Sequence, residues 1–410
     1  MNRSIRFSTL LFVLPFLVAV QPAHAATTYA WDGLGDGVTW SDPANWNPDG
    51  TPVAGDAITV ANASTTADIN TGVLGGNLSI TGSGYATTVT GILDTNTNFN
   101  ADGNSTMSIE NGAKVGFKNQ SFLKNGYDVT IKNGGVYWAS DNHASINVQS
   151  GSTVTLENGA TMDSGNFYLI MDGANTVVTM NGANSLIRNG GTTTTSISNG
   201  ARLVVNDGYY NGNNQTKVFQ IAVGTLEING GQFDTQNLFV NADAGGRTAV
   251  GTGSAKITGG DVNMISGNLY VGSATANKIG ILEIVGGTAT IDCVAYTQLA
   301  SGTLKVRIDG PGTGLSPINA TGAAGVNGLL DVGFVGAAVH GTWTVLVGSS
   351  ITDNGLAFAP GVDTDFSDGT GWTKAINGGT TLTVTHTPEP ATMALLALGG
   401  IGLLLGRKRK

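Results

Sequence analysis

Short segments between residues 107 and 291 repeat one pattern, in which alternating apolar and polar residues lead into a glycine turn and resume after it. Alternation with a period of two predicts short β-strands joined by tight turns. The segments are "MSIENGAKV" (Met107–Val115), "VTIKNGGVY" (Val129–Tyr137), "VTLENGATM" (Val154–Met162), "TSISNGARL" (Thr195–Leu203), "LEINGGQF" (Leu226–Phe233), "AKITGGDV" (Ala255–Val262) and "LEIVGGTATI" (Leu282–Ile291).

The turn glycines recur with an average spacing of about 25 residues. This period is too short for a propeller blade, and the pattern is too rich in strands for a helical repeat. It predicts an all-β fold, a right-handed parallel β-solenoid in which each repeat forms one coil. The turn glycines are Gly112, Gly134, Gly159, Gly182, Gly200, Gly230, Gly259 and Gly286.

Stacked coils satisfy one another's backbone hydrogen bonds at a spacing of about 4.8 Å. The solenoid is expected over residues 61–330, with roughly ten or eleven coils and a length on the order of 50 Å. Asn-Gly and Gly-Gly pairs supply the positive φ that its corners require. A β-sandwich of hairpins is the alternative, because Asn-Gly also marks hairpin turns.

Both ends of a solenoid need caps, because open ends expose strand edges and core. Residues 26–60 contain Trp31, Trp40 and Trp46, which we expect to cover the first coil. Stacking of exposed rings on sugars is the alternative role for these tryptophans. Residues 331–387 abandon the repeat and predict a cap of four antiparallel strands.

The first 25 residues have the pattern of a secretory signal peptide. Two cations precede an apolar run, and Ala23 and Ala25 form the small-residue cleavage site ahead of Ala26. The Sec translocon and signal peptidase are therefore expected partners.

Residues 388–410 combine a rigid tripeptide, an apolar run and a basic end. Ala391 to Gly406 would form a helix of about 24 Å, close to the bilayer core of about 30 Å. A C-terminal transmembrane helix is therefore expected, with the cations on the cytoplasmic side. The tripeptide is Pro388, Glu389 and Pro390, and the basic tail is Arg407, Lys408, Arg409 and Lys410.

The charge of the body argues against nucleic-acid binding, and the cysteine content excludes a disulfide framework. Without signal peptide and tail, 13 basic and 27 acidic residues give the body a net charge of about −14, which disfavours a nucleic-acid partner. The single cysteine, Cys293, rules out an intramolecular disulfide, and its strand-like context predicts a buried structural thiol.

We predict no catalytic residues and no cofactor. A polysaccharide-degrading enzyme, the rival class, would need carboxylates that converge in a cleft. Glu110, Glu157, Glu227 and Glu283 instead appear at equivalent coil positions beside turns, as outward stacked carboxylates. The histidines of the mature chain, His143, His340 and His386, lie in unrelated contexts, without a triad or metal pattern.

Two segments resemble a calcium loop or an ice-binding face only in part. Asp363, Asp365 and Asp368 precede a glycine as in a calcium loop, but their spacing departs from the Asp-x-Asp-x-Asp-Gly pattern. We therefore predict no metal site and a polar turn there. Residues 192–196 and 380–385 are rich in threonine, as ice-binding faces are, but these runs do not recur coil by coil.

The body and the C-terminal segment each resemble a known family of bacterial exported proteins. The segments "TWSDPANWNPDGTPVAGDAITV" and "LYVGSATANKIGILEIVGGTATI" resemble β-helical passengers of autotransporter type, which implies a surface-exposed solenoid. The tripeptide, apolar run and basic end closely resemble the PEP-CTERM sorting signal of Gram-negative bacteria. That resemblance implies recognition by an exosortase-type enzyme at the inner membrane, removal of the tail and release toward the cell surface or matrix.

These observations predict an exported, non-catalytic surface or extracellular-matrix protein that associates with exopolysaccharide or biofilm. The alternatives are a β-helix that binds or degrades polysaccharide and, second, an ice-binding protein.

Overall fold

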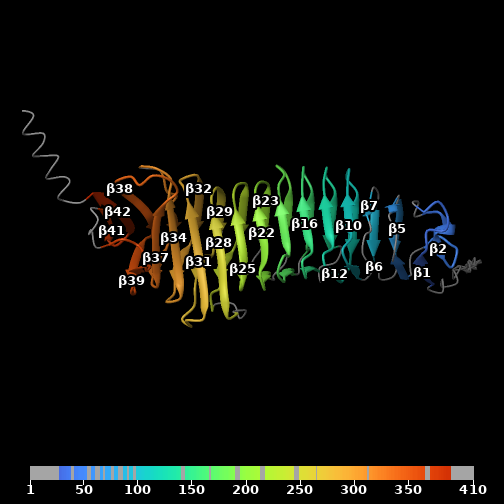
Figure 1. Ribbon diagram of the computed structural model, residues 1–410, viewed down its shortest axis with the longest axis horizontal. Helices are drawn as coiled ribbons and strands as arrows, with labels where there is room; N and C mark the ends of the chain where they lie inside the picture. The colour runs from blue at the N-terminus through green and yellow to red at the C-terminus, as the bar shows by residue number, and fades with distance from the viewer. Residues whose placement is uncertain are drawn as a thin grey trace, which may run out of the picture.

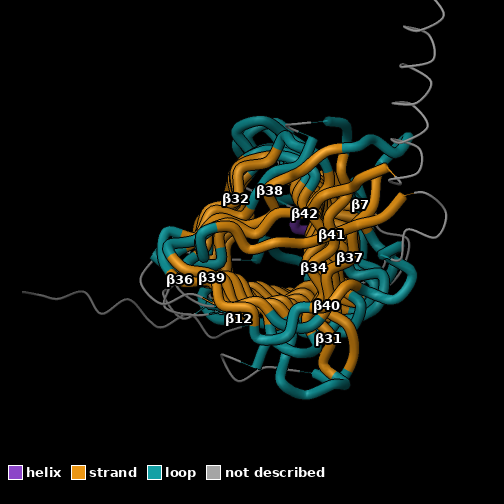
Figure 2. The backbone as a smooth tube through the Cα atoms, turned by 90° about the vertical axis from the view of Figure 1, so that its left-hand side faces the viewer, coloured by secondary structure: helices purple, strands orange, loops and turns teal. Residues whose placement is uncertain are grey.

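The computed structural model shows a rod built of stacked strands, with the N-terminal end and the C-terminal end far apart (Figure 1). It describes residues 27–37, 41–52, 57–60, 65–67, 70–74, 78–81, 86–89, 92–95, 98–139, 144–165, 168–189, 194–212, 218–243, 249–264, 266–311, 314–364 and 370–388. The strands form three long sheets, named A, B and C, which enclose the core along the rod (Figure 2). A single 3-10 turn, Pro43–Asn45, is the helical element among the described residues.

Sheet A contains fifteen strands. In spatial order they are β2 (Trp46–Asn47), β1 (Thr28–Trp31), β3 (Ala57–Val60), β6 (Leu78–Thr81), β9 (Phe99–Asp102), β12 (Gln120–Lys124), β15 (Ser145–Gln149), β18 (Leu169–Asp172), β21 (Thr195–Ser198), β24 (Val218–Ile221), β27 (Asn237–Val240), β30 (Asn268–Val271), β33 (Ala295–Gln298), β36 (Ala323–Val326) and β39 (Ser350–Asp353).

Sheet B contains thirteen strands. They are β4 (Thr65–Ala67), β7 (Ala86–Val89), β10 (Thr106–Ile109), β13 (Asp128–Ile131), β16 (Thr153–Leu156), β19 (Val177–Met180), β22 (Ala201–Val205), β25 (Gly224–Ile228), β28 (Gly251–Ile257), β31 (Lys278–Val285), β34 (Gly302–Ile308), β37 (Leu329–Phe334) and β40 (Ala357–Phe358).

Sheet C contains fourteen strands. They are β5 (Asn70–Leu74), β8 (Ile92–Thr95), β11 (Lys114–Phe117), β14 (Val136–Ala139), β17 (Thr161–Asp163), β20 (Leu186–Arg188), β23 (Tyr209–Gly212), β26 (Gln232–Thr235), β29 (Gly260–Met264), β32 (Ala289–Cys293), β35 (Ile318–Ala320), β38 (Gly341–Val347), β42 (Thr381–Pro388) and β41 (Thr370–Asn377).

From β3 to β40 the chain visits the three sheets in the order A, B, C, and the strands of successive coils pair in parallel. Ten complete coils of described strands, from β6–β8 to β33–β35, lie between residues 60 and 330. The parallel β-solenoid is thus confirmed, and the alternative of a β-sandwich of hairpins is wrong. The right-handed sense of the coil stays a prediction.

Aliphatic columns fill the interior of the rod. In sheet B, Ile109, Ile131 and Leu156 lie in register on successive coils, and Ile257, Ile284 and Val306 continue the same column further along. All six are completely buried. Because side chains alternate between the two faces of a strand, this inward column leaves its neighbours on the outer face.

The glycine corners confirm the predicted stacking and correct one assignment. The amide of Gly112 donates to the carbonyl of Asn133, and that of Gly134 donates to the carbonyl of Asn158, so successive B-to-C corners are bonded along one edge. Gly200, however, lies in an A-to-B corner between β21 and β22. The B-to-C corner of that coil contains Gly208, which precedes β23. Both kinds of corner contain glycine, so the spacing of glycines along the sequence does not distinguish an A-to-B corner from a B-to-C corner.

The N-terminal segment covers the first coil. Strand β1 pairs in parallel with β3, and β2 closes the outer edge of β1 in antiparallel fashion. Trp31 and Trp46 are buried and pack edge-to-face with ring centroids 5.0 Å apart. These two rings are therefore part of the core and not exposed for stacking on sugars. Trp40 lies outside the described residues.

The C-terminal cap is antiparallel in part. β42 pairs antiparallel with β38 and with β41, as expected. The expectation of four antiparallel strands is wrong, because β39 and β40 pair in parallel with β36 and β37 and continue sheets A and B. The amide of Ile351 in β39 donates to the carbonyl of Gly379, so the turn between β41 and β42 folds over the last rung of sheet A.

Candidate functional site

A continuous row of polar side chains runs along the outer face of sheet C. Register places one Asp, Asn or Arg at the same outward position on seven successive coils. We call this row the sheet C ladder; it comprises Asp163, Arg188, Asn211, Asp234, Asn263, Asp292 and Asn319.

Asp234 lies at the centre of the ladder and is only 3% exposed. Its carboxylate accepts hydrogen bonds from the Tyr209 hydroxyl at 2.8 Å, from Gln232 Nε2 at 2.9 Å and from Asn263 Nδ2 at 3.0 Å. These donors come from three successive coils. Burial and the adjacent Asp234 carboxylate raise the pKa of Tyr209 to about 12. The carboxylate is thus an acceptor with three protein donors that connects the coils.

The ends of the ladder have different chemistry. At the N-terminal end, Arg188 Nε donates to Asp163 Oδ2 at 3.0 Å, and the half-buried Trp138 is the outward residue one coil earlier. At the C-terminal end, Asn319 Nδ2 donates to Asp292 Oδ1 at 3.0 Å. An aromatic ring, a guanidinium and several amides thus lie with three carboxylates on one outer face of the rod.

The ladder separates its carboxylates. Asp234 and Asp292 are two coils apart, about 9–10 Å, and Asn263 lies between them in register. Retaining glycosidases place two carboxyl groups about 5–5.5 Å apart, and inverting enzymes keep room for a water between theirs. Here the intervening space is occupied by an amide.

The four glutamates singled out in the sequence do not share one coil position, which corrects that expectation. Glu110 and Glu157 follow the last inward residue of their strands, whereas Glu227 and Glu283 precede it. Three of them face cations on neighbouring coils: Lys132 lies 2.9 Å from Glu110, Arg202 lies 2.7 Å from Glu227, and Arg307 lies 3.9 Å from Glu283.

Two of the three histidines are close together, contrary to the expectation of unrelated contexts. The rings of His340 and His386 stack with centroids 5.2 Å apart and an interplanar angle of 7°. The antiparallel pairing of β42 with β38 creates this contact across 46 residues of sequence, which no local pattern shows. His143 lies outside the described residues.

Cys293 is buried in β32, as its sequence context predicts. Burial and the nearby Asp292 carboxylate raise the pKa of its thiol to about 12. The thiolate is the reactive form of cysteine, so this side chain is held in its inert state at neutral pH.

Within the described part of the chain, no three His, Cys, Asp or Glu side chains form a cluster that could hold a metal ion. Of the candidate calcium loop, only Asp363 is described; Asp365 and Asp368 lie outside. That part of the prediction therefore remains untested.

The first threonine-rich run is described only from Thr194 on, and its Thr195 pairs with Leu169 and Phe219. In the second run, Thr385 pairs with Thr342 and Thr373 in the antiparallel cap. A different set of hydroxyls stacks along the solenoid. On the outer face of sheet B, register aligns Thr88, Ser108, Thr130, Thr155 and Thr179 on five successive coils. All five are half-buried. We call them the hydroxyl ladder. The sequence carries this signal, since Ser108, Thr130, Thr155 and Thr179 each stand between two buried apolar residues.

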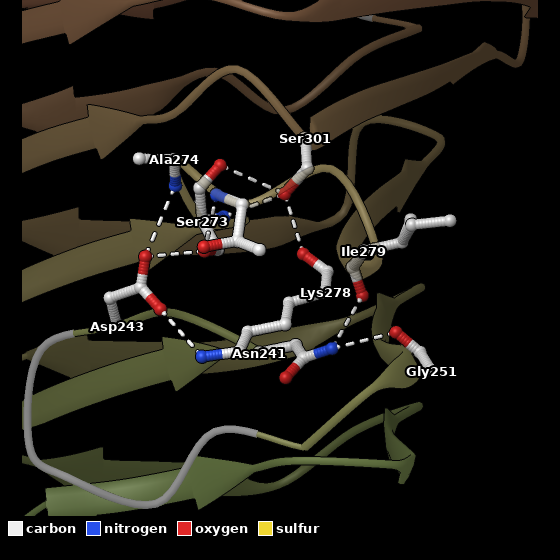
Figure 3. Close-up of polar contacts among 9 residues, drawn as sticks. Asn241, Asp243, Gly251, Ser273, Ala274, Lys278, Ile279 and Ser301 are labelled. Atoms are coloured by element: carbon white, nitrogen blue, oxygen red, sulfur yellow. Dashed lines mark hydrogen bonds and ion pairs between the residues drawn. The ribbon is translucent and has the colours of Figure 1, made fainter.

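A shallow pocket of about 340 Å³ lies where sheet A turns into sheet B, and its lining is mainly aliphatic, with Ala276, Ile279 and Leu329 among its walls. A polar network holds one wall in place (Figure 3). Asp243 accepts from the Ser273 hydroxyl, the Ala274 amide and Lys278 Nζ. The hydroxyl of Ser301 donates to the carbonyl of Lys278 at 2.5 Å. These bonds brace neighbouring coils where their strands are longest.

The sorting tripeptide begins where the described fold ends. Pro388 is the last residue of β42 and pairs with Thr370 at the start of β41. Glu389, Pro390, the apolar run and the basic tail lie outside the described residues, as do the signal peptide and its cleavage site. No helix in the described ranges is long and apolar enough to cross a membrane. The predicted helix over residues 391–406 falls beyond those ranges and stays a prediction.

Comparison with known proteins gives one match. No curated protein and no solved structure matches the chain, so the resemblance to autotransporter passengers stays a prediction. Residues 386–410 match the PEP-CTERM protein-sorting motif. The chain therefore carries a PEP-CTERM sorting motif on a repeat β-strand body, which marks it as an exported protein that an exosortase sorts.

Proposed function

We propose that this protein is a non-catalytic component of the cell surface or extracellular matrix, released from the inner membrane when the exosortase removes its tail. The observation that carries the proposal is the sorting motif at residues 386–410, which begins inside the last strand of a capped solenoid. A transmembrane helix over residues 391–406 would hold the motif beside the bilayer, and the four terminal cations would keep the tail from slipping outward.

Fractionation of the native host tests the sorting step. A mature body that lacks the residues after about position 390 is expected at the surface or in the matrix. Replacement of Pro388, Glu389 and Pro390 by alanine should leave the full chain in the inner membrane. If the alanine variant reaches the surface as the wild type does, the motif is not read and the proposal fails.

We further propose that the sheet C ladder binds exopolysaccharide. Its support is chemical: amides, the Arg188 guanidinium and the Trp138 ring lie on one outer face, where weak contacts on successive coils add up along a polymer. The excess of acidic over basic residues in the body favours a neutral glycan, or an acidic one bridged by divalent cations.

Binding of purified protein to extracted host exopolysaccharide tests this face. The double change Arg188→Ala and Asn211→Ala should weaken binding about tenfold or more, because it removes the donors of two neighbouring coils of the ladder. Thr130→Ala with Thr155→Ala, on the outer face of sheet B, is the matched control and should bind as the wild type does. Equal loss in both variants would exclude the sheet C ladder as the binding face.

The absence of catalysis is part of the proposal and has its own test. It is supported by the three donors that bind Asp234 and by the amide between Asp234 and Asp292. Protein donors thus take three of the roughly four acceptor sites of this carboxylate, which disfavours its use as a general base. Depolymerisation of the bound glycan by the wild type, abolished by Asp234→Asn, would establish the polysaccharide-degrading alternative instead.

The hydroxyl ladder favours one second candidate, ice binding. Five hydroxyl residues about 4.8 Å apart form a regular row that can order water. Inhibition of ice recrystallisation by the wild type, lost in Thr130→Val with Thr155→Val, would support it. No inhibition by the wild type would remove it.

A further inference from the structure

The last strand of the body is locked into the C-terminal end of the rod by a group of aromatic rings. The His386 ring lies 4.7 Å from the Trp372 ring and 5.1 Å from the Phe334 ring, and it stacks on His340. Trp343 lies 5.9 Å from both Phe334 and Trp372. We call these five residues the aromatic clasp.

The clasp is anchored in the rod and not only in the cap. Phe334 ends β37 of sheet B, and Trp343 belongs to β38, which pairs in parallel with β35. The Trp343 indole donates to the carbonyl of Gly310 at 3.1 Å, and His386 Nδ1 lies 2.9 Å from the carbonyl oxygen of Val339. Trp343, Trp372 and His386 are each no more than 6% exposed. His386 therefore has a fixed position relative to the solenoid.

Only Thr387 separates His386 from the sorting tripeptide. Pro388 still pairs with Thr370, so the first residue of the motif continues a strand whose conformation the clasp fixes. Proline has no amide proton and cannot extend a ladder as a donor. The motif thus starts at the last described pair of this sheet.

The short connection limits how far the motif can lie from the folded body. Five residues span at most about 18 Å when fully extended, so Ala391, the first residue of the apolar run, cannot be farther than that from His386. An enzyme that cleaves at the tripeptide must therefore meet the C-terminal end of the rod at the same time.

We propose that the aromatic clasp positions the sorting motif for its processing enzyme, and that the clasp-bearing end of the rod is the surface that faces this enzyme and the membrane. The partner is a membrane-associated peptidase that binds an extended Pro-Glu-Pro segment and contacts a folded sheet next to it. The inference rests on the proposed sorting function and adds a determinant inside the body, outside the tripeptide.

Four inserted residues test the inference without disturbing the clasp. Gly-Ser-Gly-Ser between Thr387 and Pro388 keeps every clasp contact but frees the motif from its fixed position. Pulse-chase in the native host should show removal of the tail slowed about tenfold or more, since misplacement of a reacting segment has effects of this size. The matched control places the same insert between Ala249 and Val250, in the loop between β27 and β28, several coils away from the clasp, where Val250 is exposed. It should be processed at the wild-type rate.

Substitution within the clasp gives a second readout. Trp372→Ala should slow processing, and Trp372→Phe, which keeps a ring against His386, should restore most of the rate. Thermal unfolding of each purified variant identifies any that fails to fold. The inference is overturned if the variant with the insert before Pro388 is processed as fast as the control, or faster.

The triple alanine variant of the tripeptide separates this inference from the proposed function. If its processing is blocked while the insert before Pro388 has no effect, the motif is read but the clasp does not position it. If the triple variant is processed normally, the proposed function itself is wrong.

Discussion

The outer face of sheet B changes its chemistry halfway along the rod. In the N-terminal half, one outward column is the hydroxyl ladder, Thr88 to Thr179. After Val204, the same column continues on five successive coils with alternating charge. We call these five residues the charge ladder; they are Glu227, Lys256, Glu283, Lys305 and Asp331. The strands lengthen as well, from four residues in β10 to eight in β31.

The inward columns do not change in the same way. Ile131 in the first half and Ile284 in the second occupy the same inward column, and both are fully buried. The comparison shows that the core dictates the repeat while the outer face is free to vary. Alternating charges also favour one pairing of coils over a shifted one, since a slip by one coil would bring like charges together. A row of hydroxyls carries no such preference.

The largest expected effect lies in the shared core. Ile131→Ala and Ile284→Ala should each lower the free energy of unfolding by about 2–5 kcal/mol, because each leaves a cavity between two coils. Urea denaturation of the purified protein measures both. Losses that agree within about 1 kcal/mol would show that the two halves have equivalent cores. A much smaller loss for one of them would mean that its half unfolds independently, as repeat proteins can.

The core and the repeat could be predicted from sequence because they depend on local alternation and on turn glycines. Gly112, Gly134 and Gly159 needed only their spacing. What the sequence did not reveal depends on register between coils. The charge ladder and the sheet C ladder place residues about 25 positions apart side by side, and the contact between His340 and His386 follows from a strand that returns antiparallel. Gly200 was misassigned for the same reason, since spacing does not tell one edge of a coil from another.

The charge ladder and the hydroxyl ladder should differ in how much an added negative charge destabilises the protein, and this effect is smaller than that of the core substitutions. Lys305 lies in register between Glu283 and Asp331, and its Nζ is 3.9 Å from Asp331 Oδ2. Lys305→Glu would place three acidic side chains in a row and should lower the free energy of unfolding by about 1 kcal/mol, as like charges on paired strands repel. Thr155→Glu introduces a charge at the equivalent position between two neutral residues, so its effect should stay within about 0.5 kcal/mol.

The dependence of stability on salt concentration tests whether charge causes the difference between these two variants. Screening at an ionic strength of about 1 M should remove most of the difference between Lys305→Glu and the wild type, because the charges are solvent-accessible. It should leave Thr155→Glu nearly unchanged. A Lys305→Glu defect that persists in high salt would assign the loss to packing of the lysine stem and not to charge alternation.

The smallest expected effect tests whether the hydroxyl ladder contributes to stability at all. The hydroxyl of Ser108 donates to Glu110 Oε1, and this bond, followed by that from Lys132, lowers the pKa of the Glu110 carboxyl. A carboxyl with a folded-state pKa below its unfolded value stabilises the fold above the unfolded pKa, near 4.3. This stabilisation is lost as the pH falls through the folded-state pKa. Ser108→Ala should therefore destabilise the protein at pH 7 by at most about 0.5 kcal/mol, since Glu110 is solvent-screened. It should match the wild type near pH 2.

Thr130→Val, at the next rung of the ladder, is the control and should show no pH-dependent difference. If Ser108→Ala and the wild type differ equally at both pH values, the serine acts through packing, and the hydroxyl ladder is an outer face without electrostatic influence on the fold.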